Sequence, residues 1–188
     1  MDAYTYQKTS GIVVDELRTA LSSIPEADVE RLISAITSAE QVFFVGVGRV
    51  MLSLQAFAKR LAHLGISAHC VGDITEPAIT DKDLLIVGSG SGSTLFPVAI
   101  AKKAHTIGAK VVHIGSNPNS ELKEIAEFMV RIPVRTKQYL PDEIESQQPM
   151  TSLFEQSLLL LGDITAKMII ERRQFNMKEL WAYHANLE

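Results

Sequence analysis

The sequence predicts an α/β fold: one doubly wound, five-stranded parallel sheet with helices on both faces. Five short apolar runs alternate with segments of helical periodicity, and strands that are covered on both faces have this continuous apolar character. With 188 residues, of which 46% are hydrophobic, the chain is long enough to bury one substantial core. We therefore expect a single domain over residues 1–188.

Two helices are predicted over about 10–40, because apolar residues recur there at helical spacing and a break falls at 22–25 (SSIP). The first strand is expected at 41–46 (QVFFVG), before a helix of about 50–64. The other strands are expected in SAHCVG (67–72), DLLIVGS (83–89), KVVHIGS (110–116) and EFMVRIP (127–133), and further helices at about 95–107 and 120–126.

The C-terminal third contains a long loop and a strongly apolar helix. Residues 134–149 are polar and include Pro141 and Pro149, which predicts a loop of a length that is often functional. The helix expected at about 150–173 is apolar around most of its circumference, so it needs cover on more than one face. A second subunit is the simplest source of that cover, and burial within one chain is the alternative.

Composition excludes several classes of function. The net charge is −4 and no run of Lys and Arg is present, so neither nucleic acid nor a membrane surface is an expected partner. The single cysteine, Cys70, cannot form an internal disulfide, and the five histidines have no metal-ligand spacing, so we expect no metal and no cofactor. No apolar stretch approaches the ~18 residues of a membrane span, and the first residues lack the pattern of a signal peptide. We expect a cytoplasmic protein.

The third predicted strand ends in GSGSGST (88–94), directly before a helix. Open parallel sheets bind ligands beyond the carboxyl ends of their strands, and a helix N-terminus offers unpaired N–H groups to an anion. We predict a phosphate site in which Ser89, Ser91, Ser93 and Thr94 donate hydrogen bonds. No Gly-Lys-Ser/Thr follows and the spacing is not that of a dinucleotide motif, so a nucleotide is not implied. The alternative is a flexible turn with a Ser or Thr N-cap.

The first predicted strand ends in a similar turn, GVGR (46–49), which also opens a helix. If the two strands are neighbours, two helix N-termini lie around one crevice. Gly48 and Arg49 then join the phosphate site, with Arg49 as the only nearby fixed cation. The alternative is a tight turn with a solvated arginine.

Longer motifs carry a family resemblance over nearly the whole chain. These are GVGRVMLSLQAFAKRLAHLG (46–65), VGDITEPAI (71–79), the GSGSGST loop, AKKAHTIGAKVVHIGSNPNSELKEIAE (101–127), QPMTSLFEQ (148–156) and the final HANLE. The chain resembles the 6-phospho-3-hexuloisomerase branch of the SIS (sugar isomerase) domain proteins. The GSGSGST segment (88–94, the serine loop) would by itself indicate only an SIS domain. FAKRLAHLG, QPMTSLFEQ and HANLE resemble the hexuloisomerase branch specifically.

The resemblance implies one SIS-type phosphosugar-binding domain and a homo-oligomer with active sites near subunit boundaries, a homotetramer with a dimer as the alternative. It also implies interconversion of 3-hexulose 6-phosphate and fructose 6-phosphate in the ribulose monophosphate pathway, without a cofactor. Two positions depart from the family: Val50 replaces a common serine and Tyr183 replaces a common arginine. An isomerase of a different phosphosugar, or a non-catalytic sugar-phosphate sensor, therefore stays an alternative.

Moving a carbonyl from C3 to C2 requires a base for the C2 proton, an enediol intermediate and return of the proton to C3. Glu155 matches the family's proposed catalytic glutamate, although with Ser152 it also forms a capping-box sequence. His63 matches the family's LxHLG segment and is a candidate proton shuttle, or else a core or interface histidine. His184, in HANLE, is a second candidate that could enter a neighbouring subunit's site, or else a solvated tail residue.

Overall fold

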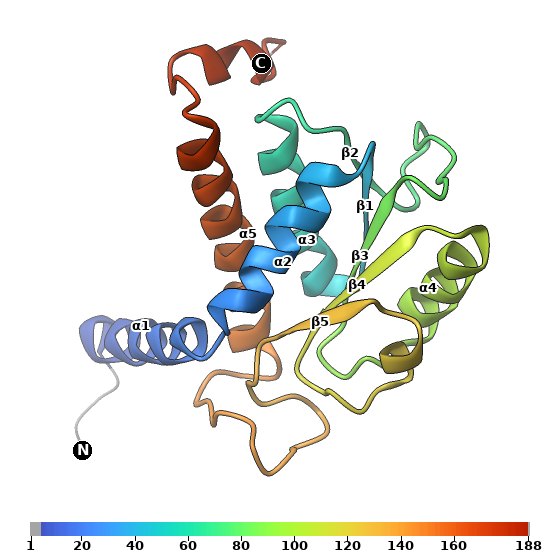
Figure 1. The fold of residues 1–188 in the computed structure, drawn as a ribbon. Helices are drawn as coiled ribbons and strands as arrows, with labels where there is room; N and C mark the ends of the chain where they lie inside the picture. The colour runs from blue at the N-terminus through green and yellow to red at the C-terminus, as the bar shows by residue number, and fades with distance from the viewer. Residues whose placement is uncertain (1–4, 188) are drawn as a thin grey trace.

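The structure is a computed structural model that describes residues 5–187. Its five parallel strands lie in the order β2-β1-β3-β4-β5 (Figure 1), which confirms the predicted fold class. The strands are β1 (Val42–Val45), β2 (Ala68–Cys70), β3 (Leu84–Gly88), β4 (Lys110–Gly115) and β5 (Phe128–Arg131). Each falls inside the apolar run that predicted it.

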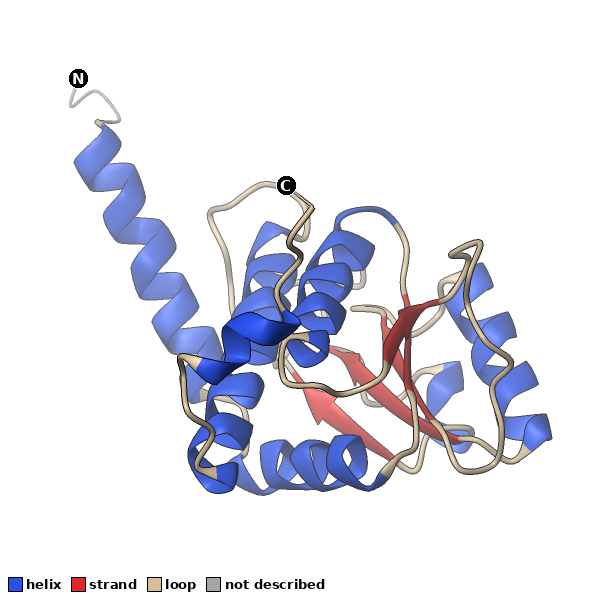
Figure 2. Cartoon of the chain, turned by 90° about the horizontal axis from the view of Figure 1, so that it is seen from above, coloured by secondary structure: helices blue, strands red, loops and turns tan. Residues whose placement is uncertain are grey.

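Helices cover both faces of the sheet (Figures 1 and 2). One face carries α2 (Glu26–Ser38), α3 (Gly48–Ala62) and α5 (Ser152–Arg173), and the other carries α4 (Leu95–Ile107) and the short helix η1 (Glu121–Glu124). The helix α1 (Tyr6–Ser22) projects from the first layer, and η2 (Glu179–Tyr183) lies near the C-terminus. Side chains alternate between the two cores, as in β1, where Phe44 joins the larger core and Phe43 the smaller.

The chain changes direction in the sheet between β1 and β3. From β1 it moves outward to β2, then returns to β3 and continues through β4 to β5 on the other side. The register pairs Val45 at the end of β1 with Val87 near the end of β3. β1 and β3 are therefore neighbours, which is the condition for one shared crevice, and the turn before α3 and the serine loop before α4 leave the sheet side by side. This is the position where open α/β sheets bind ligands.

The apolar helix α5 is covered mainly by its own chain. It packs on α3 and also contacts α1 and α2, and ten of its residues are buried. Burial within one chain, the alternative reading of this segment, therefore accounts for much of its apolar surface without a second subunit. No helix within residues 5–187 is long and apolar enough to cross a membrane.

Close packing of α3 against α5 depends on Gly162. A Cβ atom at this position would lie 2.7 Å from Cγ of Phe57, whose ring is fully buried. Only a residue without a side chain lets the two helices approach this closely. Their N-terminal ends, which carry Arg49 and Glu155, are thereby held together.

We expect Gly162→Ala to lower the free energy of unfolding by about 1–3 kcal/mol, because the added methyl group overpacks the helix interface. Gly11→Ala is the matched control, since nothing lies within 4 Å of a Cβ at this position in α1, and it should raise stability by up to about 1 kcal/mol. Urea unfolding of both variants measures the difference. Equal stability of the two variants would contradict the tight α3–α5 contact.

Candidate active site

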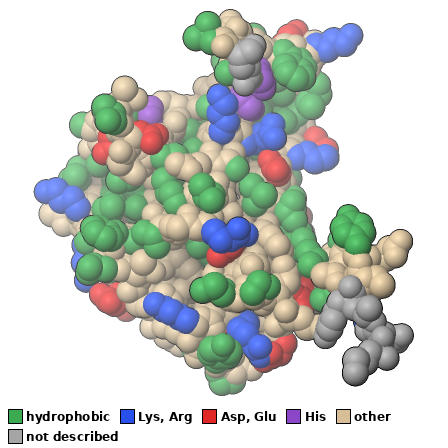
Figure 3. Space-filling view, turned by 180° about the vertical axis from the view of Figure 1, so that it is seen from behind, with side chains coloured by type: hydrophobic (Ala, Val, Ile, Leu, Met, Phe, Trp, Pro, Cys, Tyr) green, Lys and Arg blue, Asp and Glu red, His purple; other side chains and the backbone are tan. Residues whose placement is uncertain are grey.

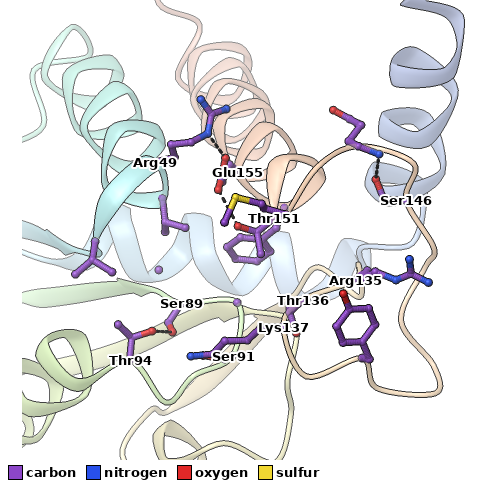
Figure 4. Close-up of a pocket in the computed structure, with 18 residues that line it drawn as sticks. Arg49, Ser89, Ser91, Thr94, Arg135, Thr136, Lys137, Ser146, Thr151 and Glu155 are labelled. Atoms are coloured by element: carbon purple, nitrogen blue, oxygen red, sulfur yellow. Dashed lines mark hydrogen bonds and ion pairs between the residues drawn. The ribbon is translucent and has the colours of Figure 1, made fainter. Parts of the chain in front are cut away.

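A cavity of about 560 Å³ lies beyond the carboxyl ends of β1 and β3 (Figure 4). This is a size suited to a small metabolite. Four segments form its wall: the turn before α3, the serine loop, the loop 134–149 and the start of α5. The residues that line it are Val47, Arg49, Val50, Gly88, Ser89, Gly90, Ser91, Thr94, Arg135, Thr136, Lys137, Tyr139, Ser146, Gln148, Met150, Thr151, Phe154 and Glu155.

The backbone of the serine loop is arranged to receive an anion. The carbonyl oxygens of Ser89, Gly90 and Ser91 accept hydrogen bonds from β4 and the turn after it. The donors are the side chains of His113 (2.8 Å) and Asn117 (3.2 Å) and the N–H groups of Ser116 (2.9 Å) and Asn117 (3.1 Å). Within residues 5–187, the N–H groups of Gly90, Ser91 and Thr94 have no acceptor. The carbonyl oxygens of the loop are therefore bound on the side of β4, and its unpaired N–H groups remain as hydrogen-bond donors at the cavity wall.

Three of the four predicted hydroxyl groups belong to residues that line the cavity: Ser89, Ser91 and Thr94. The hydroxyls of Ser89 and Thr94 lie 3.1 Å apart (Figure 4). Ser93 is not a lining residue; its hydroxyl donates to Oγ of Ser91 at 3.2 Å. Gly48 does not line the cavity either, although its left-handed backbone (φ 58°) shapes the turn that presents Arg49.

Arg49 and Glu155 meet across the cavity from the serine loop (Figure 4). The Arg49 guanidinium pairs with Oε2 of Glu155, and the Thr151 hydroxyl donates to Oε1 at 2.8 Å. The Glu155 side chain is only 9% exposed, against 65% for Arg49. In addition, the Ser53 hydroxyl donates to the Glu155 carbonyl at 2.8 Å, so α3 and α5 are tied together at this point.

The capping box that the sequence suggested at Ser152 does not form. The helix α5 begins at Ser152 with Thr151 as its N-cap, and the Ser152 N–H donates to the carbonyl of Pro149. The Glu155 carboxylate instead accepts from the side chains of Thr151 and Arg49. Its carboxylate is therefore not used to cap the helix.

The prediction that Arg49 is the only nearby cation is wrong. Arg135 and Lys137, from the loop after β5, also line the cavity. The sequence predicted that this loop is long and polar. Hydrophobic periodicity, however, does not predict where a segment without regular secondary structure lies in the fold. Two basic residues at the start of the loop were the available signal.

The structure does not bring His63 or His184 to the cavity of their own chain. His63 caps the C-terminal end of α3, about 20 Å along the helix axis from Arg49. Its ring stacks on that of His184, with centroids 5.1 Å apart, in a separate hollow that Arg60 and Trp181 also line. Figure 3 shows histidine side chains at this end of the molecule, beside hydrophobic and basic groups.

The two departures from the family lie in different places. Val50 lines the cavity, beside Arg49. Tyr183 lies away from it and packs its ring against Gly65, where a Cβ would be 3.1 Å from the tyrosine Cζ. Of the two, only Val50 is placed to contact a ligand bound within the same chain.

The family described as SIS domain matches residues 35–162. The chain belongs to this family. It is 35% identical over 176 residues to the 3-hexulose-6-phosphate isomerase of Bacillus subtilis (94% of this chain, 95% of the relative). It is 37% identical over 177 residues to that of Mycobacterium gastri (94% and 88%). A crystal structure from Methanococcus jannaschii, described as inferring a molecular function of 3-hexulose-6-phosphate isomerase, is 30% identical with a TM-score of 0.82 (96% and 99%).

Within the described residues of this SIS domain, no group of three or more His, Cys, Asp or Glu side chains could hold a metal ion. Cys70 is buried, and burial raises the pKa of its thiol to about 11, with a further contribution from the charge of Asp73. The thiol is therefore protonated at neutral pH and is not an activated nucleophile.

His113, to which the sequence analysis gave no role, supports the serine loop of the SIS domain. It lies in β4, is 2% exposed, and its Nε2 is 2.8 Å from the Ser89 carbonyl. Because a carbonyl only accepts, Nε2 carries the proton. Burial lowers the pKa of His113 to about 4, although the hydrogen bond to Ser89 acts in the opposite direction. Nothing in the apolar run KVVHIGS distinguishes this histidine from an ordinary core residue.

The lowered pKa of His113 predicts an acid-sensitive fold. Below the ordinary value of 6.5, the unfolded chain binds a proton that the folded chain excludes until about pH 4. The contribution of the neutral imidazole to stability is therefore complete above pH 6.5 and declines as the pH falls toward 4, by roughly 1.4 kcal/mol per pH unit.

The variant His113→Gln keeps a donor for Ser89 but does not titrate. We expect its difference in unfolding free energy from the wild type to shrink by about 2 kcal/mol between pH 6.5 and pH 5. Urea unfolding at both pH values measures this, and other titrating groups cancel in the comparison. A difference that stays constant with pH would contradict the assignment.

Proposed function

We propose that this SIS-domain protein is an isomerase that interconverts 3-hexulose 6-phosphate and fructose 6-phosphate. The observation that carries the proposal is that a nearly buried carboxylate, Glu155, and the donor-rich serine loop face one cavity. The relatives named 3-hexulose-6-phosphate isomerase, which match almost the full chain, support this choice of reaction.

The serine loop is proposed to bind the phosphoryl group. The hydroxyls of Ser89, Ser91 and Thr94 and the free N–H groups of the loop provide donors, and the N-terminus of α4 adds its dipole. Because phosphate binding fixes one end of the substrate, the sugar chain extends across the cavity toward Arg49 and Glu155. Ser93 acts indirectly in this scheme, through its hydrogen bond to Ser91.

Glu155 is proposed to be the base. Its carboxylate takes the proton from C2 of 3-hexulose 6-phosphate, the C–H electron pair forms a C2=C3 double bond, and the C3 carbonyl oxygen becomes an enediolate oxygen. The Arg49 guanidinium lies beside the carboxylate and stabilises the charge on that oxygen. The O2 proton then moves to O3, Glu155 returns its proton to C3, and the C2=C3 electron pair forms the new C3–H bond as C2 becomes the carbonyl carbon of fructose 6-phosphate.

His63 and His184 can take part in the reaction only from another copy of the chain, because the active-site cavity of their own chain lies at the opposite end of α3. We propose a homo-oligomer, specifically a tetramer, in which one of them moves the hydroxyl protons in a neighbour's cavity. A cytoplasmic location fits this metabolic reaction and the single, buried cysteine.

Isotope exchange tests the reaction. Fructose 6-phosphate incubated with the protein in deuterated water should gain deuterium at C3, because proton abstraction there leads to the same enediol. Glu155→Gln should lower the rate of this exchange by several orders of magnitude. Asp163→Asn changes an exposed acid on the same helix and should leave the rate unchanged. Proton NMR reports the labelled position. Deuterium at C1 would indicate a different isomerase, and binding without exchange would indicate a sensor.

We expect Ser91→Ala to weaken binding of fructose 6-phosphate by roughly 10-fold, because it removes a hydroxyl from the phosphate site. Ser93→Ala is the control, since Ser93 does not line the cavity, and it should change affinity by less than about threefold. Isothermal titration calorimetry measures both. Unchanged affinity in Ser91→Ala would exclude its hydroxyl from the phosphate site.

A further inference from the structure

Three cations line the cavity within the described part of the chain, and two of them have acidic partners. Arg49 pairs with Glu155, and Arg135 pairs with Glu145. Lys137 is exposed and forms no ion pair with any residue of 5–187. It is therefore the cation whose charge is available to a ligand.

The serine loop lacks a positive charge of its own. A phosphate monoester carries between about −1.5 and −2 charges at neutral pH, whereas the loop offers only hydroxyl and N–H donors. Figure 4 shows Lys137 on the same side of the cavity as the serine loop, with Arg49 and Glu155 across from it. We propose that Lys137 pairs with the phosphoryl group of the bound sugar phosphate and that Glu143 is the positioning residue that holds it there. This inference rests on the proposed function.

Glu143 closes the turn that carries Lys137. Glu143 is 9% exposed, and its carboxylate accepts four hydrogen bonds. The donors are the hydroxyls of Ser116 (2.9 Å) and Thr136 (2.8 Å) and the N–H groups of Thr136 (3.1 Å) and Leu140 (3.0 Å). Every oxygen is thus satisfied, as a buried carboxylate requires. The backbone on both sides of Lys137 is fixed by this single side chain.

The same group of contacts joins the turn to the serine loop. Ser116, which donates its hydroxyl to Glu143, donates its N–H to the carbonyl of Gly90. The Thr136 methyl group lies 3.1 Å from where a Cβ of Gly90 would be. Lys137 follows directly in the sequence, so its backbone is held next to the phosphate site.

The other arm of the loop is also held. Glu16, in α1, accepts hydrogen bonds from the Ser146 hydroxyl (2.7 Å), the Gln147 N–H (2.7 Å) and the Gln148 side chain (3.1 Å). Burial raises the pKa of Glu16, but these hydrogen bonds outweigh it and lower the pKa overall. With both arms anchored, the loop presents Lys137 from a defined position.

The test compares binding of inorganic phosphate to Lys137→Met and Lys103→Met. Lys103 is an exposed lysine of α4 that does not line the cavity, so both variants lose the same charge. We expect Lys137→Met to weaken phosphate binding by roughly 10- to 100-fold, as for a lost charge-assisted hydrogen bond. Lys103→Met should bind as the wild type does, and Lys137→Arg should retain most of the affinity. Equal affinities in the two methionine variants would overturn the proposal.

Steady-state kinetics separate this role from a general structural effect. In Lys137→Met the KM for fructose 6-phosphate should rise by about the same factor as the phosphate Kd, while kcat falls far less. A fall in kcat at unchanged KM would contradict the role in phosphate binding. Phosphate binding is measured without turnover, so a wild-type protein that binds phosphate through Lys137 but does not isomerise the sugar would contradict only the proposed function.

The positioning role of Glu143 is tested by a double-mutant cycle. Glu143→Gln replaces one acceptor oxygen by an NH₂ group and should weaken phosphate binding in the wild-type background. In the Lys137→Met background it should cause less than about a twofold further loss, because the residue it positions is absent. Losses that multiply in the double variant would show that Glu143 acts independently of Lys137. Thermal unfolding confirms that each variant compared is folded.

Discussion

Parallel pairing of β1 with β3 is the constraint on which the candidate site depends. From β1 the chain moves outward to β2, and from β3 it moves the other way to β4, so the connections that leave these two neighbouring strands diverge and open a crevice beyond their ends. Helices α3 and α4 both begin there, one with Arg49 and the other with the serine loop. The third component, Glu155, arrives only because α5 packs tightly on α3 through Gly162.

The site is held by buried polar groups that direct the serine loop and the neighbouring turn. His113, Ser116 and Asn117 bind the loop's carbonyl oxygens, and Glu143 binds the turn 136–143. Burial of such groups is unfavourable unless each finds a partner. For His113 and Asn117 the partners are carbonyl groups of the serine loop, which must point away from an anion. The same bonds that satisfy the buried side chains therefore leave N–H donors at the cavity wall, before any ligand is bound.

Local sequence patterns were sufficient for the five strands, the α-helices and the serine loop, but not for the short helix η2. Apolar runs such as QVFFVG identify a strand without knowledge of its neighbours, and GSGSGST identifies a turn at a strand end. The contributions of Lys137, His113 and Glu143 depend instead on contacts between distant segments. The sequence of a loop without periodicity does not predict where the loop packs. A histidine in an apolar strand cannot be distinguished by sequence from an ordinary core residue. The distance between His63 and the cavity follows from the length of the helix that joins Arg49 to His63, and this length could have been predicted from the sequence.

The distribution of charge across the cavity suits a reaction with two demands. The phosphoryl group requires a cation that stays bound throughout, whereas the enediolate requires one that acts where charge develops. Lys137 lies with the serine loop, and Arg49 lies with Glu155 on the opposite wall. If one arginine served both ends, it would have to leave the carboxylate to bind the phosphate. In the proposed mechanism, separate cations allow Glu155 to keep Arg49 as its partner while Lys137 holds the phosphoryl group at the other end of the substrate.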